Sequence, residues 1–213
     1  MNTKKLIGAI IGVIAFVILI AGATFAWLSV TATVNNAQYT GTSKNFVINY
    51  QGSANISGFK EIKSGSATTA AITSSTSASV AGDAWAAVTA EKTANDAPAN
   101  HFRVKLAIGN NTMQTGAIIW AICKGSCPTN TALATVTSST VTCGTGVTNC
   151  GRVAAETSGS IELYDDQTTF NTDAQVSTTT YNVYFWLDSD TLSNDDIGAQ
   201  FSGYIYAEAT QLG

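Results

Sequence analysis

The N-terminal part of the chain carries a different hydrophobic pattern from the rest. Residues 6–28 contain only apolar residues, glycines and one threonine, and no charged residue occurs between Lys5 and Lys44. On a helix these apolar positions cover all sides, which is typical of a membrane-spanning segment and not of a core helix. Lys4 and Lys5 predict that the N-terminus stays inside the cell while the rest is exported. We therefore predict a hydrophobic helix over residues 1–29, as a signal peptide or a transmembrane anchor.

The end of this leader contains a candidate cleavage site. Ala23 and Ala26 satisfy the small-x-small rule for a signal peptidase, with cleavage after Ala26 and Trp27 as the new first residue. The apolar run exceeds the usual length of about 7–15 residues, which favours retention as an anchor through residues 6–28. Both outcomes place the body of the protein outside the cell, at its surface or in the extracellular space. Of the two, we expect cleavage.

Beyond the leader, short runs of β-branched and aromatic residues alternate with turn residues, and no long stretch has a helical period. Runs of this kind predict an all-β fold, an antiparallel β-sandwich of jelly-roll or immunoglobulin-like type, as a single domain over residues 30–213. The expected strands are residues 29–34, 45–50, 84–91, 102–109, 117–123, 132–142, 159–165, 180–188 and 201–211.

One predicted strand is apolar on both faces. In "YNVYFWL", Val183, Phe185 and Leu187 share one face. Tyr184 and Trp186 share the other. Because a strand with one solvated face alternates between apolar and polar residues, we expect this strand in the middle of a sheet or under a covering element.

Residues 63–82, "KSGSATTAAITSSTSASVAG", are low in complexity and almost without charge. We predict a flexible surface loop here. The alternative is an O-glycosylated or partner-binding loop, for which the density of Ser and Thr is the only signal.

The exported part is acidic and poor in charge. Without Lys4 and Lys5, eight basic residues stand against fourteen acidic ones, a net charge of −6. Nucleic acid is not an expected partner, because its phosphates need clustered Lys or Arg. The only histidine is His101, and the chain has no hydrolase, zinc-protease or phosphate-loop motif. We predict a non-catalytic protein without a cofactor.

Four cysteines occur in two groups, "CKGSC" and "CGTGVTNC". Zinc ligands usually form pairs with about two to four residues between them, and the second pair here is wider. In an exported chain two disulfides are the better interpretation. The pairs are either local, Cys123 with Cys127 and Cys143 with Cys150, or crossed between the groups, and the sequence leaves this open.

The densest acidic stretch is "LDSDTLSNDDIG", with Asp188, Asp190, Asp195 and Asp196. Alternating carboxylates suit Ca²⁺, so these four are weak candidates for a calcium site. The EF-hand pattern fails, because Ala199 stands where that motif has Glu. The alternative is a solvated loop between two strands.

Two segments resemble known surface proteins. The segment "AGATFAWLSVTATVNNAQYTGTS" is similar to the start of camelysin and TasA-type proteins of Gram-positive bacteria (Firmicutes). The matching residues are Gly22, Ala23, Thr24, Phe25, Ala26, Trp27 and Asn36. Near the C-terminus, Trp186, Asn194 and Gln211 resemble the closing strands of surface proteins with this leader. The resemblance implies export, processing by a dedicated signal peptidase, a β-sandwich and assembly into extracellular fibres of a biofilm matrix.

These features lead to three hypotheses. The first is a cell-surface structural protein, a matrix or fibre subunit or a tethered adhesin, that self-associates when residues 27–40 pair with the sheet edge of a neighbouring copy. The second is a pilin-like subunit that keeps its hydrophobic helix in a filament core. The third is a module that binds a glycan or host-surface ligand through aromatic residues such as Trp85 or Tyr204. The first is our main expectation.

Overall fold

The computed structural model describes residues 29–32, 40–43, 46–52, 59, 61–73, 85–92, 100–170 and 177–211. The strands are β1 (Ser29–Ala32), β2 (Thr40–Ser43), β3 (Phe46–Gly52), β4 (Glu61–Ile62), β5 (Trp85–Lys92), β6 (Asn100–Asn111), β7 (Ile118–Lys124), β8 (Ala134–Val136), β9 (Val141–Cys143), β10 (Asn149–Arg152), β11 (Gly159–Phe170), β12 (Ser177–Asp188) and β13 (Phe201–Gln211). The helices are the 3₁₀ turns η1 (Ser64–Ser66) and η2 (Asn194–Asp196) and the short α2 (Thr69–Thr73). No helix within these ranges is long and apolar enough to cross a membrane, and the predicted leader helix lies outside them.

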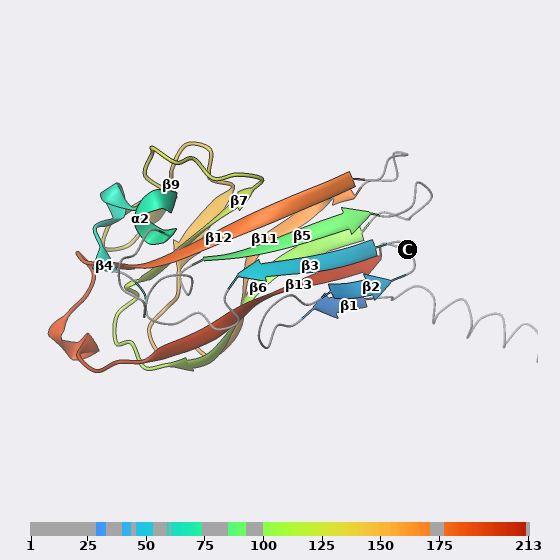
Figure 1. Cartoon of the computed structure of the whole chain (residues 1–213). Coiled ribbons are helices and arrows are strands. Elements are labelled where there is room, and N and C mark those ends of the chain that lie inside the picture. Colours follow the sequence, from blue (N-terminus) through green and yellow to red (C-terminus); the bar gives the residue numbers. More distant parts are fainter. Residues whose placement is uncertain are drawn as a thin grey trace, which may run out of the picture.

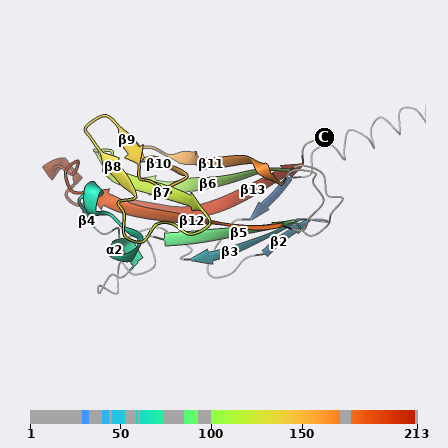
Figure 2. The same cartoon turned by 90° about the horizontal axis from the view of Figure 1, so that it is seen from above.

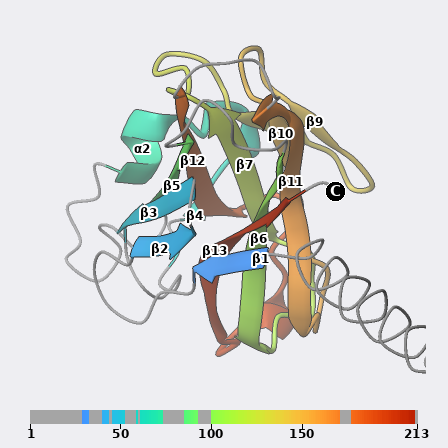
Figure 3. The same ribbon diagram turned by 90° about the vertical axis from the view of Figure 1, so that its right-hand side faces the viewer.

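The strands form two large sheets that face each other (Figures 1, 2 and 3). The four-stranded sheet has the order β1-β13-β6-β11, and the seven-stranded sheet has the order β10-β7-β12-β5-β3-β2, with β4 added to β12. Strands β8 and β9 form a separate hairpin. Neighbouring strands are antiparallel except β4 and β12. The prediction of an antiparallel all-β protein is confirmed.

The main core lies between the two sheets. In β6, Phe102, Val104 and Leu106 are fully buried, while Arg103 and Lys105 alternate with them and are only half-buried. This period of two turns one face of the strand into the core and the other outward. The core cluster consists of Phe102, Val104, Leu106, Ile108, Met113, Ala117, Ile118, Trp120, Ile122, Val153, Leu163, Tyr181, Val183, Phe185, Ile205 and Ala207.

A second apolar cluster covers the outer face of the seven-stranded sheet. Tyr184 and Trp186 of β12 belong to it, whereas their neighbours in the strand belong to the main core. Ala67, beside α2, and Leu133, beside β8, are fully buried in this cluster. The Leu133 amide also donates to the Ala67 carbonyl at 2.9 Å, which joins the two covering segments. Figure 1 shows α2 beside β12. The prediction that β12 lies centrally under a covering element is confirmed.

The expectation of a flexible surface loop over residues 63–82 is wrong for its first half. Residues 63–73 contain η1 and α2, and the side chains of Ser64, Ala67 and Ile72 are buried. Small side chains let this segment approach the sheet closely, so a composition that suggested a loop instead forms part of the cover. Residues 74–82 lie outside the described residues.

One close approach in the seven-stranded sheet requires a glycine. Gly151 of β10 is the partner of Trp120 in β7. A Cβ atom at Gly151 would lie 2.7 Å from Cζ2 of the Trp120 ring. Real Cβ atoms do not come this close to a ring carbon. The Trp120 indole can therefore occupy its position in the core only because residue 151 has no side chain.

We predict that Gly151→Ala lowers the free energy of unfolding by about 1–3 kcal/mol, because the indole must shift to accommodate the new methyl group. Gly65→Ala is the matched control, since a Cβ at Gly65 meets nothing within 4 Å. Its expected effect is within about 0.5 kcal/mol. Denaturant unfolding of both variants measures the difference, and equal midpoints would contradict the packing constraint at Gly151.

Candidate functional site

The short strand β1 lies at one edge of the four-stranded sheet. It pairs antiparallel with β13, with Ser29 opposite Thr210 and Ala32 opposite Ala207. It begins where the predicted leader ends, and its described part is four residues long. Among the described residues this is the shortest pairing in the sheet, and it contributes few backbone hydrogen bonds.

The partner strand β13 is much longer than the part that β1 covers. On its inner side β13 pairs with β6 along its whole length, from Phe201 to Gln211. On its outer side β1 pairs only with residues 207–210. Among the residues that the structure describes, no strand pairs with the outer edge at residues 201–206. Unpaired backbone groups at a sheet edge form a template on which another strand can add.

Outward side chains next to this edge are joined by ion pairs. Lys105 Nζ lies 2.7 Å from Glu208 Oε2, and this hydrogen bond raises the pKa of Lys105. The same amine lies 6.0 Å from the centre of the Tyr206 ring. Arg103 Nε lies 3.4 Å from Asp165 Oδ2. These contacts connect β13, β6 and β11 on the outer face of the sheet. The surface next to β1 is therefore formed by paired charged side chains.

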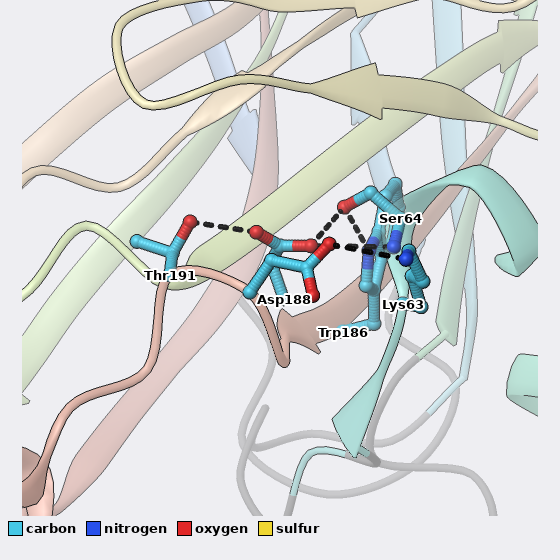
Figure 4. Close-up of polar contacts among 6 residues, drawn as sticks. Lys63, Ser64, Trp186, Asp188 and Thr191 are labelled. Atoms are coloured by element: carbon cyan, nitrogen blue, oxygen red, sulfur yellow. Dashed lines mark hydrogen bonds and ion pairs between the residues drawn. The ribbon is translucent and has the colours of Figure 1, made fainter.

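The predicted calcium ligand Asp188 is instead a buried hydrogen-bond acceptor (Figure 4). Its Oδ1 accepts from the Ser64 amide at 3.2 Å and from the Ser64 hydroxyl at 2.6 Å. Its Oδ2 accepts from the Thr191 hydroxyl at 2.6 Å. The Trp186 indole donates to Ser64 Oγ at 3.3 Å. The carboxylate thereby ties η1 to the end of β12, and the Ser64 hydroxyl that it holds is the polar partner of the buried indole.

The other three calcium candidates make different contacts. Asp190 is exposed and 3.8 Å from Lys63, and Asp195 is exposed at the surface of η2. Asp196 closes the capping box of η2 with Ser193. Its carboxylate accepts hydrogen bonds from the Thr115 amide and hydroxyl, and the Gln114 amide also donates to it.

The electrostatic surroundings of Asp196 agree with this anchoring role. Burial pushes the pKa of Asp196 up, but hydrogen bonds from Thr115, Ser193 and Gln114 outweigh it, so the pKa lies below its usual value. A carboxylate held by several donors favours its charged form. Asp196 therefore fixes the β12–β13 connection to the loop after β6.

No group of three or more metal-binding side chains gathers anywhere in the described part of the chain. A shallow hollow of about 300 Å³ lies beside Asp188, lined also by Val136, Thr137, Ser138, Asp190 and Thr191. Both oxygens of Asp188 accept from protein donors, Oδ1 from Ser64 and Oδ2 from Thr191.

The four cysteines form two local disulfides, which settles the pairing that the sequence left open. Cys123 is bonded to Cys127 and Cys143 to Cys150, with Cα–Cα distances of 5.3 and 5.5 Å. Cys123, Cys127 and Cys150 all contact the outer apolar cluster. The disulfides therefore hold the covering segments against the seven-stranded sheet.

The processing residues Ala23, Ala26 and Trp27 lie outside the described residues, as do the side chains of Trp85 and His101. Tyr204 is half-buried on the outer face of β13, and its ring centroid lies 6.1 Å from that of Tyr206. Neither a protein-family model, nor a curated protein, nor a solved structure matches this chain.

We predict that Asp188→Ala lowers the free energy of unfolding by about 2–4 kcal/mol, because it removes the acceptor of the buried Ser64 donors and of the partly buried Thr191 hydroxyl. Asp190→Ala is the control, since it removes only an ion pair whose side chains are 70% and 63% exposed. Its expected effect is within about 0.5 kcal/mol. Equal thermal stability of the two variants would show that Asp188 is not the anchor of η1.

Proposed function

We propose that this protein is a non-catalytic, exported cell-surface structural protein that assembles through its N-terminal strand. It acts as a matrix or fibre subunit or as a tethered adhesin. The observation that carries the proposal is the four-residue pairing of β1 beside a longer outer edge of β13. A strand held this weakly at an edge is suited to exchange between copies.

Exchange costs little free energy, because β1 makes the same backbone hydrogen bonds with β13 of its own chain and with β13 of a neighbouring copy. When β1 of one copy pairs with residues 207–210 of the next, the register and the bonds are those of the single chain. Residues 33–38 follow β1, and in the same antiparallel register they lead along residues 206–201 of the neighbouring copy. Exchange of this segment would link the subunits head to tail.

The strand order supports a jelly roll over the immunoglobulin-like alternative. A jelly roll arises when a long antiparallel hairpin wraps on itself. Its first strand then pairs with its last strand, and its second strand pairs with its second-to-last strand. Here β1 pairs with β13, β5 with β12, β6 with β11 and β7 with β10. The hairpin of β2 and β3 extends the edge formed by β5. In this topology the first strand is an edge strand of the four-stranded sheet.

Two disulfides and the low charge support export, since disulfides persist in oxidising surroundings outside the cytosol. The alternative, a pilin-like subunit, keeps the hydrophobic helix in a filament core. N-terminal sequencing of the native protein separates the two: a start at Trp27 supports strand exchange, a start near Ile7 or Gly8 supports the pilin-like subunit, and an intact Met1 supports a simple tether.

We predict that deleting residues 27–36 from the processed protein gives a folded monomer that no longer polymerises. The core remains intact because β1 occupies only an outer edge of its sheet. Circular dichroism checks the fold, and light scattering with electron microscopy checks assembly. A chain with residues 27–36 in scrambled order controls for length, and polymerisation of the deletion variant at the normal rate would refute the proposal.

A further inference from the structure

The amine of Lys124 and the carboxylate of Asp166 make a contact that the proposed function does not use. Lys124 Nζ lies 2.8 Å from Asp166 Oδ2, and the Asp166 side chain is 1% exposed. The Tyr181 hydroxyl donates to the same oxygen at 2.7 Å. Lys124 ends β7 and Tyr181 lies in β12, whereas Asp166 lies in β11 of the other sheet. The contact therefore joins the two sheets.

Aromatic side chains surround this carboxylate. Phe102 is the partner of Asp166 in the ladder between β6 and β11. The Phe102 ring stacks on Tyr181 with centroids 5.0 Å apart, and the Tyr164 ring lies 6.0 Å from Tyr181. Burial raises the pKa of Tyr164, and the charge of Asp166 raises it further, so this phenol stays protonated. The Asp166 carboxylate is thus buried next to aromatic side chains.

We propose that Lys124 and Asp166 condense to an intramolecular isopeptide bond between β7 and β11. In the contact, the ammonium group passes one proton to Oδ2, which gives a neutral amine and a neutral carboxylic acid. The Asp166 side chain is 1% exposed and that of Lys124 is 37% exposed, and burial of the carboxylate lowers the cost of forming this neutral pair relative to the ion pair. The amine is then a nucleophile held next to its electrophile, the arrangement that accelerates intramolecular reactions most.

The condensation balances without another reactant. Nζ attacks Cγ of Asp166 and forms the N–C bond, and the Cγ–Oδ2 bond breaks. Oδ2 leaves as water, with the proton that it received first and a second proton from the amine. The Tyr181 hydroxyl, which already donates to Oδ2, polarises the bond that breaks and stabilises the charge that develops on the leaving oxygen. One amide, one water and no net charge remain.

Such a bond changes the connectivity of the sandwich. It closes a loop from residue 124 to residue 166, which contains β10 and the disulfide between Cys143 and Cys150. A covalent link across this separation restricts the unfolded chain in the way that a disulfide does, but reductants do not break it. The inference is independent of strand exchange, because neither residue lies on β1 or β13.

Tryptic peptide mapping of the purified, reduced full-length protein tests the bond. Trypsin does not cleave after a lysine whose amine is acylated, so the expected product is a branched peptide that contains Lys124 and Asp166. Its mass is lower than the sum of its parts by one water. Recovery of the two segments as separate peptides of unaltered mass from folded protein would overturn the proposal.

Lys124→Arg is the informative variant, because arginine preserves the positive charge beside Asp166 but does not condense with it. The branched peptide is expected to disappear, and the melting temperature is expected to fall by about 5–10 °C, in line with the loss of a cross-link. If the contact is only an ion pair, Lys124→Arg has the same melting temperature as the wild type. If the variant does not fold, the peptide map of the wild-type protein alone shows whether the bond is present.

Discussion

The burial of β12 on both faces is the constraint on which the rest of the structure depends. Val183 and Phe185 fill the main core, and Tyr184 and Trp186 fill the outer cluster. Each large side chain contributes on the order of 2–3 kcal/mol when it leaves water, so neither face of the strand is stable without cover. The main core requires the second sheet, and the outer cluster requires η1, α2 and the β8–β9 hairpin. Asp188 at the end of the same strand fixes that cover through Ser64.

The strands were largely predictable because their side chains alternate. Each of the nine expected runs contains a strand, but residues 132–142 form the hairpin of β8 and β9 and not one strand. Thr137 and Thr140 close its turn, with the Thr137 amide donating to the Thr140 carbonyl at 2.8 Å. The short strands β2, β4 and β10 were missed, because two to four residues are too few for a period. The cover over residues 63–73 was missed because its small residues show no apolar stripe.

The polar sites were less predictable, because their partners are distant in the sequence. The acidic stretch suggested calcium, but Asp188 binds Ser64, 124 positions away, and Asp196 binds Thr115, 81 positions away. No local motif announces either pair. Nothing in the sequence distinguished Asp166 from the other carboxylates, and only the fold shows it beside Tyr181 and Lys124. The cysteine pairs were open for the same reason, since spacing alone does not determine which side chains meet.

The proposed assembly depends on two properties of the fold: a sheet that is covered on both faces, and a short edge strand on the other sheet. The outer face of that sheet carries ion pairs such as Lys105 with Glu208, which connect β6 to β13. In the proposed assembly these contacts would keep β13 in place while β1 exchanges between copies. This separation between a stable body and a labile edge is the central claim of the proposed function.

A mixed cross-linking experiment tests that claim most directly. One population carries Ser29→Cys and the other Thr210→Cys, at positions that face each other in the register of β1 and β13. After the two are mixed, assembled and oxidised, the account predicts disulfide-linked pairs that contain one chain of each kind. Ser138→Cys, at an exposed site on the β8–β9 turn, replaces Ser29→Cys as the control and is expected to give none. Filaments that form without the mixed cross-link would contradict assembly through the N-terminal strand.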